Sequence, residues 1–291
     1  MRIVAALVAL SSISACVAHD EAIGLQSPLV AYPATPDSCG KRLASGPSDS
    51  LYELNSDDIR LVNWNIQKGS DPDWSADLTM QVGEPDLLVL QEVPLNMDVW
   101  TTVANDHYRS FAPGHRTWRA MTGVMTLSRA EPLVQCNLSS TEPWLGSPKA
   151  TIITTYGLTD TDESLLVINM HGLNFTFGTG DFEEQVRQAL AEARVHNGPM
   201  LLSGDFNTWH RGQSDLLQRM AAELELGALS YDKDHRKRAF GQPLDHIYVR
   251  GLDVISATSD KVTSSDHNPI AVRLKLNRHS HQRVAEAAAG S

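Results

Sequence analysis

Short segments dominated by apolar residues recur along the chain from residue 59 onward, and most have the period of a β-strand. In IRLVNWNIQ (59–67), two sets of side chains alternate, one being Ile59, Leu61, Asn63 and Asn65 and the other Arg60, Val62, Trp64 and Ile66. Alternate positions of a strand lie on one face, so this pattern predicts a strand. The continuous apolar run in PDLLVLQEV (85–93) suits a strand buried on both faces. Further strands are predicted at residues 123–129, 151–158, 164–173, 199–206, 244–251 and 268–276.

Two segments between these strands have the period of an amphipathic helix. Residues 180–198 place Phe182, Val186 and Leu190 on one stripe, with acidic residues near the start, where the helix dipole favours them. Residues 213–227 have the same character and end at a glycine. Because strands outnumber helices and the two kinds interleave, the pattern predicts an α/β fold.

The regular pattern covers residues 58–276 and is missing at both ends. Residues 17–57 are rich in Pro, Ser, Gly and Ala without a sustained period, which predicts an irregular tether or lead-in. Residues 277–291 follow the last predicted strand and are expected to form a loose tail.

The first sixteen residues, MRIVAALVALSSISAC, predict an export signal. They have a positively charged start, an apolar run too short to span a membrane, and small residues before Cys16. The segment ISAC (13–16) resembles the cleavage box of bacterial lipoproteins, which implies that Cys16 is lipidated and anchors the protein in the periplasm or outer membrane. The alternative is an ordinary signal peptide cut near Ala15 or Ala18, which would give a secreted protein.

The composition and charge of the chain limit the kinds of partner that it can bind. The chain has 291 residues, of which 42% are hydrophobic and 20% charged, as in ordinary soluble proteins, and its formal charge is −11. This acidic balance argues against tight, non-specific binding to duplex DNA, but it does not exclude a nuclease that releases its product. Cys39 and Cys136 either pair, as in an oxidising compartment, or are separate buried thiols. The sequence has no coiled-coil pattern, and we expect a monomer.

Polar residues recur where the predicted strands end. Ligand sites of layered α/β proteins lie beyond strand ends, on loops held by a rigid sheet. If these ends converge, they gather one asparagine, four carboxylates and two histidines. The residues are Asn65, Glu92, His171, Asp205, Asp245, Asp266 and His267.

The stretch LLSGDFNTWH (201–210) allows two interpretations. Asp205 and Asn207 are two positions apart, so in a strand both side chains would point the same way, about 6–7 Å from each other. They would then present a carboxylate and an amide to a site. Alternatively they mark a turn, because Asp and Asn bond to their own backbone two residues on.

The candidate residues indicate metal-assisted hydrolysis. Clustered carboxylates repel one another and need a compensating cation. Carboxylate and amide oxygens favour Mg²⁺ or Mn²⁺, or Ca²⁺ in a looser site, and no H-E-x-x-H motif of a zinc protease is present. A His–Asp pair can take a proton from an attacking water, while the cation neutralises the oxygens of a phosphate ester. The sequence shows neither a nucleophile elbow nor a P-loop, which favours direct attack by water.

Six motifs in order resemble the endonuclease/exonuclease/phosphatase superfamily: WNIQ, LQEV, INMHGLN, SGDFNTW, LDHIYV and SSDHNPI. The resemblance covers roughly residues 58–276, and from HGLNF to SSDHNPI it is greatest to the bacterial YafD-like branch. It implies a four-layer α/β sandwich of two packed mixed β-sheets flanked by helices. It also implies a divalent-metal-dependent phosphoric ester hydrolase.

The resemblance also implies a role for each candidate. Asn65 and Glu92 would hold the cation and Asp266 would complete its shell. His267 would be the general base, oriented by Asp245. His171 would contact the scissile phosphate or act as the acid for the leaving group. Asp205 and Asn207 would position the attacking water and a phosphate oxygen. Asn174 is a weaker candidate for substrate binding.

Two basic clusters, KDHRKR (233–238) and residues 107–119, stand out from the acidic whole. Each is either a solvated loop or part of a lip that steers a polyanion, with Arg236 and Arg238 as candidate substrate ligands. We therefore expect a phosphodiesterase, and most of all a nuclease acting outside the cytoplasm on nucleic acid. The alternatives are a phospholipid or sphingomyelin phosphodiesterase and a catalytically silent binding lipoprotein. DNA versus RNA, endo versus exo, and diester versus monoester stay open.

Overall fold

The structure is a computed structural model that describes residues 36–44, 52–82, 84–97, 99, 107–117, 120–174, 176 and 178–278. The predicted export signal, Cys16, and the parts of the predicted tether and tail that fall at residues 17–35, 45–51 and 279–291 lie outside these ranges. The described helices include none that is long and apolar enough to cross a membrane.

The first sheet is mixed and holds, among the described residues, seven strands in the order β10-β14-β15-β1-β2-β4-β3. Its centre is the parallel pair β1–β2, and antiparallel neighbours flank that pair. The carboxyl ends of β1 and β2 therefore meet at one edge. The strands are β1 (Ile59–Asn65), β2 (Leu87–Pro94), β3 (Tyr108–Arg116), β4 (Met121–Ser128), β10 (Lys233–Asp234), β14 (Leu252–Ser259) and β15 (Ile270–Leu276).

The second sheet is also mixed, and its described strands follow the order β5-β6-β7-β8-β13-β9. Here β7 and β8 form the central parallel pair. A separate two-stranded hairpin, β11–β12, precedes β13. The strands are β5 (Val134–Thr141), β6 (Pro148–Gly157), β7 (Ser164–His171), β8 (Met200–Asp205), β9 (Gly227–Ala228), β11 (Arg238–Ala239), β12 (Gln242–Pro243) and β13 (Asp245–Arg250).

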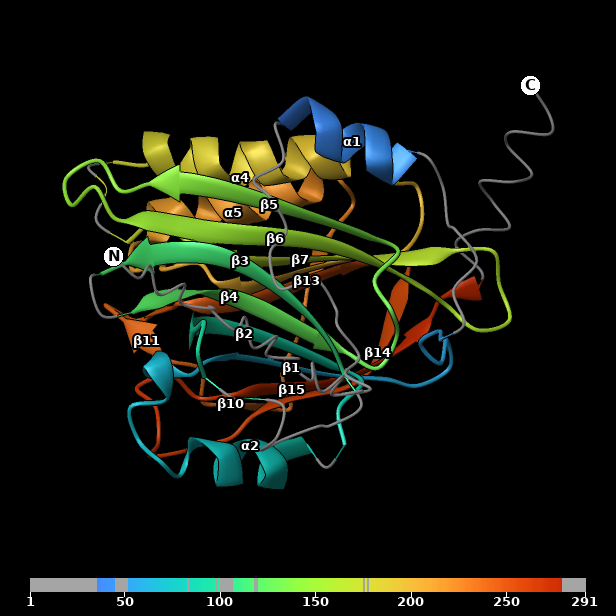
Figure 1. Cartoon of the computed structure of the whole chain (residues 1–291), viewed down its shortest axis with the longest axis horizontal. Coiled ribbons are helices and arrows are strands. Elements are labelled where there is room, and N and C mark those ends of the chain that lie inside the picture. Colours follow the sequence, from blue (N-terminus) through green and yellow to red (C-terminus); the bar gives the residue numbers. More distant parts are fainter. Residues whose placement is uncertain are drawn as a thin grey trace, which may run out of the picture.

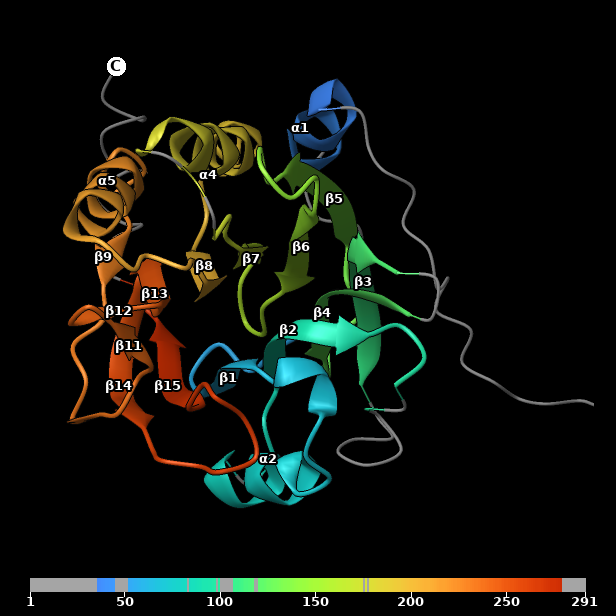
Figure 2. The ribbon, with the colours of Figure 1, turned by 90° about the vertical axis from the view of Figure 1, so that its left-hand side faces the viewer.

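The two sheets pack face to face with helices on both outer faces (Figures 1 and 2). Helices α1 (Pro36–Ala44), α4 (Gly180–Ala193) and α5 (Arg211–Ala222) cover the second sheet, and α2 (Trp74–Val82) covers the first. A short 3₁₀ turn, η1 (Gln67–Gly69), follows β1. This is the predicted four-layer sandwich of two mixed sheets.

In the described part of the chain, three large apolar clusters and a small one around Ile152 hold the layers together. The middle one lies between the sheets and includes Leu61, Val167 and Ile247, all at most 1% exposed. The outer two lie under α4 and α5 and under α2. Each fully buried aliphatic side chain contributes about 1.5–3 kcal/mol relative to an exposed one, so these clusters supply most of the driving force.

A buried polar seam crosses the sheet–sheet interface just below the strand ends. The Gln91 side-chain amide donates to Oδ1 of Asn63 (3.1 Å) and of Asn169 (2.9 Å), and the Ser203 hydroxyl donates to Asn63 Oδ1 (3.0 Å). These residues come from β2, β1, β7 and β8 in turn. Since hydrogen bonds are directional, the seam fixes how the four central strand ends lie relative to one another.

The structure corrects the prediction of an irregular segment over residues 17–57. Residues 36–44 form helix α1, and Leu54 makes a β-bridge with Leu158. Cys39 and Cys136 form a disulfide that ties α1 to β5, so the paired interpretation holds and that of separate thiols is wrong. Within the described residues, the lead-in is part of the packed domain.

The eight predicted strands and two predicted helices are all present, with ends shifted by a few residues. The sequence analysis missed the helices α1 and α2, the strands β3, β5 and β14, and the short elements η1, β9, β10, β11 and β12. Residues 108–116, within the basic cluster, form β3, whose YRSFAPGHR sequence contains a proline and a glycine that obscure its period. Strand β14 has two exposed apolar side chains, Val254 and Ile255, which obscure its alternation.

Candidate active site

The predicted strand ends converge at one edge of the sandwich. His171 ends β7 and lies beside Asp205, the last residue of the parallel strand β8. Asp245 begins the antiparallel strand β13 and pairs with Asp205 on the other side. His267 reaches the same place from the loop before β15, where its backbone carbonyl accepts a hydrogen bond from Trp64 Nε1 (2.8 Å).

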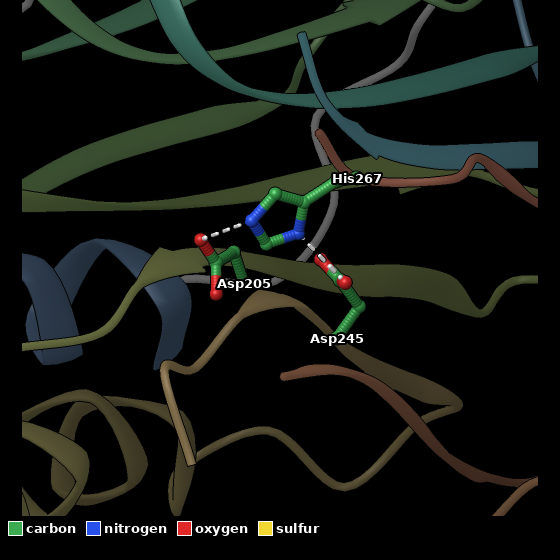
Figure 3. A group of neighbouring side chains, drawn as sticks. All are labelled: Asp205, Asp245 and His267. Atoms are coloured by element: carbon green, nitrogen blue, oxygen red, sulfur yellow. Dashed lines mark hydrogen bonds and ion pairs between the residues drawn. The ribbon is translucent and has the colours of Figure 1, made fainter. Parts of the chain in front are cut away.

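Asp245, His267 and Asp205 form a row of buried side chains (Figure 3). His267 Nδ1 lies 2.8 Å from Asp245 Oδ2, and its Nε2 lies 3.7 Å from Asp205 Oδ2. Burial alone would lower the pKa of His267, but the charges of Asp245 and Asp205 outweigh it and raise the pKa to about 10. Two carboxylates thus stabilise the imidazolium form and orient the ring.

Both interpretations of the LLSGDFNTWH stretch, a turn and a site residue, hold for Asp205. Its Oδ1 accepts a hydrogen bond from the Asn207 backbone N–H (3.0 Å), which is the local turn. Its Oδ2 faces His267 and accepts from Asn65 Nδ2 (2.9 Å). Burial is the largest cause of the raised pKa of Asp205; the charge of Asp245 adds to it and that of His267 opposes it. The turn therefore positions the carboxylate, and the two interpretations are not alternatives.

Asn207 has a left-handed backbone conformation (φ 51°), and its side-chain amide donates to the Gly172 carbonyl (3.0 Å). Gly172 allows the two strand ends to approach, because a Cβ there would lie 2.4 Å from the Phe206 carbonyl oxygen. The amide of Asn207 is thus held beside Asp205 at the edge of the cavity described below.

His171 lies in the opposite electrostatic environment. Lys149 Nζ donates to its Nε2 at 2.8 Å, while Asp205 Oδ2 and Glu92 Oε1 are 3.6 and 4.0 Å away. Burial, with the nearby charge of Lys149 second, lowers the pKa of His171 well below its usual value. The proximity of two acids therefore does not make an ion pair, and the ring is neutral with its proton on Nδ1.

The predicted metal ligands line one open cavity of about 610 Å³, together with His171, Asp205, Asn207 and His267. Glu92 has a left-handed backbone (φ 55°) at a bulge in β2, which turns its carboxylate toward this cavity. The ammonium of Lys68 lies 3.4 Å from Glu92 Oε2, and that of Lys237 lies 3.8 Å from Asp266 Oδ2.

These residues fit a divalent cation. Asn65, Glu92 and Asp266 offer only oxygen ligands to the cavity, as Mg²⁺ prefers. Their carboxylates attract positive charge already, since lysine ammonium groups stand beside both of them. Distance alone would also let Asp205, Asp245 and His267 hold an ion. We favour the Glu92 end, because Nδ1 of His267 is already bonded to Asp245, which is 0% exposed.

The remaining predicted residues have local partners. Asn174 lines the cavity, and its backbone N–H donates to Glu142 Oε1 (3.1 Å). Arg236 is mostly buried over the Tyr231 ring and donates to Asp234 and to the Asp245 carbonyl. Neither Arg236 nor Arg238 is among the residues that line this cavity. Their part in substrate binding stays a prediction.

The sequence analysis missed seven cavity residues: Gln67, Lys68, Lys149, Trp209, Ala239, Phe240 and Leu244. Lys149 is the second residue of β6 and reaches the site because β6 pairs with β7, which ends at His171. Trp209 belongs to the quoted stretch LLSGDFNTWH, and its position two residues after Asn207 was the available signal. A single lysine or an isolated phenylalanine in a loop carries no comparable signal.

The chain belongs to the endonuclease/exonuclease/phosphatase family, whose model matches residues 62–267. The UPF0294 protein plu0699 of Photorhabdus laumondii is 35% identical over 242 residues, which cover 83% of this chain and 92% of that protein. Its name states no activity, and assignment to the YafD-like branch stays a prediction.

Solved structures show the same fold at low identity. The human nocturnin catalytic domain with bound sulfate is 18% identical, with a TM-score of 0.58 over 78% of this chain and 97% of that one. A mannosyl-6-phosphatase of Bacteroides thetaiotaomicron is 15% identical, with a TM-score of 0.57 over 74% and 99%. The second is named for a phosphatase activity, and at these identities the likeness concerns the fold alone.

Proposed function

We propose that this protein hydrolyses phosphodiesters with a divalent cation, by direct attack of water, and that its substrate is nucleic acid. The family acts on phosphate esters. The observation that carries the proposal is the row Asp245–His267–Asp205, in which His267 and Asp205 line the same cavity as Glu92, Lys149 and His171. This arrangement brings a buried His–Asp pair and the ammonium of Lys149 to one cavity.

His267 is the general base in this proposal. It acts in its neutral form, which takes a proton from water at Nε2 while Asp245 holds Nδ1 and stabilises the resulting imidazolium. Because the pKa of His267 is raised to about 10, this form is a minority at neutral pH, and the rate should rise as the pH rises. Asp205 and the Asn207 amide orient the water and a phosphate oxygen. Lys149, paired with His171, donates to the oxygens that gain charge on the leaving side.

Asn65, Glu92 and Asp266 would hold the cation, which when bound neutralises phosphate oxygens and polarises the ester. In its absence Lys68 partly balances Glu92. A chelator is therefore expected to abolish turnover while leaving the fold in place, because the Asp245–His267 bond involves none of these three residues.

A diester is favoured over a monoester by the shape of the site. A second cavity of about 140 Å³, lined by Gly114, His115 and Ser147, adjoins the first at Lys149 and His171. A phosphate bound beside Lys149 and His171 would have lined space on both sides. A monoester needs a pocket on one side only.

Action outside the cytoplasm, with a lipid anchor at Cys16, is part of the same proposal. The disulfide between Cys39 and Cys136 supports it, since such bonds persist in oxidising compartments. Intact-mass spectrometry of the protein purified from a bacterial host tests the anchor. An unmodified alanine or valine N-terminus would contradict it.

The test is a panel of plasmid DNA, RNA, sphingomyelin vesicles, bis-p-nitrophenyl phosphate and p-nitrophenyl phosphate. Each is incubated with Mg²⁺ or with EDTA, using the wild type and Asp205→Asn, which removes a charge but keeps the shape. We expect Mg²⁺-dependent cleavage of diesters, fastest for a nucleic acid and lost in the variant. Faster turnover of the vesicles or of the monoester would overturn the substrate assignment, and EDTA-resistant cleavage would overturn the metal dependence.

A further inference from the structure

Phe240 is the most conspicuous exposed side chain near the site. It is 88% exposed and lines the main cavity. It lies with Gly241 in the two-residue loop of the β11–β12 hairpin, and both have positive φ (49° and 83°), as in a type I′ turn. Asn or Gly normally fills the first position of this turn, and a bulky aromatic residue there is strained. Neither burial nor turn geometry explains a phenylalanine here.

The hairpin holds this side chain in a defined place. Arg238 Nη1 donates to the Gly241 carbonyl (3.2 Å), and its Nη2 donates to Asp234 Oδ2 (2.7 Å). On the other strand, the Thr208 hydroxyl donates to the Pro243 carbonyl (2.7 Å). Thr208 follows Asn207, so the hairpin is fastened to the segment that carries the site's own residues.

Trp209 provides a second ring beside Phe240. Its indole N–H donates to the Asn174 carbonyl (2.9 Å), and His210 packs edge-on against it with centroids 4.9 Å apart. The Trp209 and Phe240 centroids are 6.0 Å apart with the planes tilted by 56°. A flat ligand ring fits between two other rings only if their centroids are about 7 Å apart. A ligand ring would therefore stack on the exposed face of Phe240 and would not enter the gap between Phe240 and Trp209.

We propose that Phe240, supported by Trp209, stacks the nucleobase next to the scissile phosphate. This rests on the proposed function and specifies its substrate. The two rings line the same cavity as Asp205, Asn207 and His267. An aromatic face accepts any base, because every base has a π-face, so the subsite selects for nucleotides without selecting a sequence.

A lipid chain fits this feature less well than a base. A membrane-binding surface needs several apolar side chains together, whereas the neighbours of Phe240 on the hairpin include Arg238 and Gln242. Phe240 also contacts Trp209 within the cavity rim instead of standing apart from it. The lipid alternative is tested below.

The first experiment measures cleavage of two single-stranded oligonucleotides with Mg²⁺. One carries a base at every position, and the other carries tetrahydrofuran abasic residues on both sides of the cleaved bond. In Phe240→Ala, kcat/KM for the first is expected to fall about tenfold, the lower part of the range for loss of one base–aromatic stack. The abasic substrate, cleaved more slowly by the wild type, should be unaffected. Phe240→Trp should restore the difference between the substrates.

The control is Ile255→Ala, which removes another exposed apolar side chain from β14. It should leave both substrates unchanged. Equal losses on the two oligonucleotides in Phe240→Ala, or no loss on either, would overturn the stacking role. A loss of turnover confined to sphingomyelin vesicles would replace the base by a lipid.

A binding measurement separates this inference from the proposed function. Calorimetry compares deoxyadenosine 5′-monophosphate with deoxyribose 5-phosphate, which lacks the base, on the wild type and Phe240→Ala. The nucleotide should bind more tightly than the sugar phosphate, and the variant should lose about tenfold of that advantage. If the wild type cleaves no diester but shows this advantage, the subsite stands and the hydrolase proposal fails. If it cleaves diesters but shows no advantage, only the subsite fails.

Discussion

The two sides of the active site are held in different ways. On one side, His267 and Asp245 are buried and joined by a 2.8 Å hydrogen bond. On the other, the side chains of Glu92 and Asp266 are 24% and 47% exposed, and their ion pairs with Lys68 and Lys237 are 3.4 and 3.8 Å long. One side is fixed by burial and hydrogen bonds, and the other is held by longer contacts at the edge of solvent.

The difference indicates a division of labour. A general base must be oriented to within a fraction of an ångström, and a buried hydrogen bond provides that without any ligand. A cation site can stay open to solvent, since the ion brings its own strong attraction for carboxylates. We therefore expect the His267 side to keep its geometry in any metal state and the Glu92 side to respond to what is bound.

The largest expected effect is at His267. His267→Ala should lower kcat by about 10³-fold or more, because the proton acceptor is gone while the Trp64 bond to the residue 267 backbone carbonyl is kept. Initial rates on bis-p-nitrophenyl phosphate with saturating Mg²⁺ measure it. His235→Ala, which removes a half-buried histidine outside the cavity, is the control and should be close to wild type. Loss of activity in both variants would point to general destabilisation.

The next effect concerns the opposite side. Glu92→Gln should raise the Mg²⁺ concentration for half-maximal activity at least tenfold, because a neutral amide replaces a charged ligand. Titrations of rate against Mg²⁺ compare it with His267→Ala, whose Mg²⁺ dependence should stay near that of the wild type. If excess Mg²⁺ fails to restore the activity of Glu92→Gln, as it should fail for His267→Ala, Glu92 acts in some other way than as a cation ligand.

Much of this site could be predicted because its residues end predictable strands. Asn65, His171 and Asp205 each terminate a strand with a strong apolar pattern, and parallel pairing brings such ends together. The pairing of Asp245 with His267 followed from the family resemblance, and the structure shows the bond. The metal ligands Glu92 and Asp266 are placed at the same cavity, and their binding of an ion stays a prediction.

The rest could not be predicted, because it depends on contacts between segments distant in sequence. Lys149 becomes relevant only once β6 lies beside β7, and Phe240 only once its hairpin is fastened to Thr208. Helix α1 was missed since its PDSCGKRLA segment is short, contains a proline, a serine and a glycine, and packs through Cys39 and Leu43. Local composition describes such segments as loops.

An intermediate effect should come from the polar seam that supports both sides. Asn169 Nδ2 donates to the Leu90 (3.2 Å) and Met125 (3.0 Å) carbonyls, and its Oδ1 accepts from Gln91. Asn169→Ala leaves these buried groups unsatisfied and should lower the free energy of unfolding by about 1–3 kcal/mol. Urea denaturation measures it. Ser203→Ala, which removes a single hydrogen bond, should lower the free energy of unfolding by a smaller amount. A larger loss in Ser203→Ala than in Asn169→Ala would show that the seam does not hold the strand ends.

The smallest effect sharpens the comparison most directly. If Lys68 stands in for the cation at Glu92, Lys68→Ala should strengthen Mg²⁺ binding about two- to fivefold, since a half-exposed ion pair is worth less than about 1 kcal/mol. Calorimetric Mg²⁺ titration without substrate measures this apart from any role of Lys68 in substrate binding. Lys275→Ala removes the same charge at an exposed pair with Asp253 on the β14–β15 strands and should leave Mg²⁺ affinity unchanged. Equal affinities in all three proteins would mean that Glu92 binds its cation without competition from Lys68. Tighter binding in Lys68→Ala alone would show that the open side of the site is balanced by its own lysine until the metal arrives.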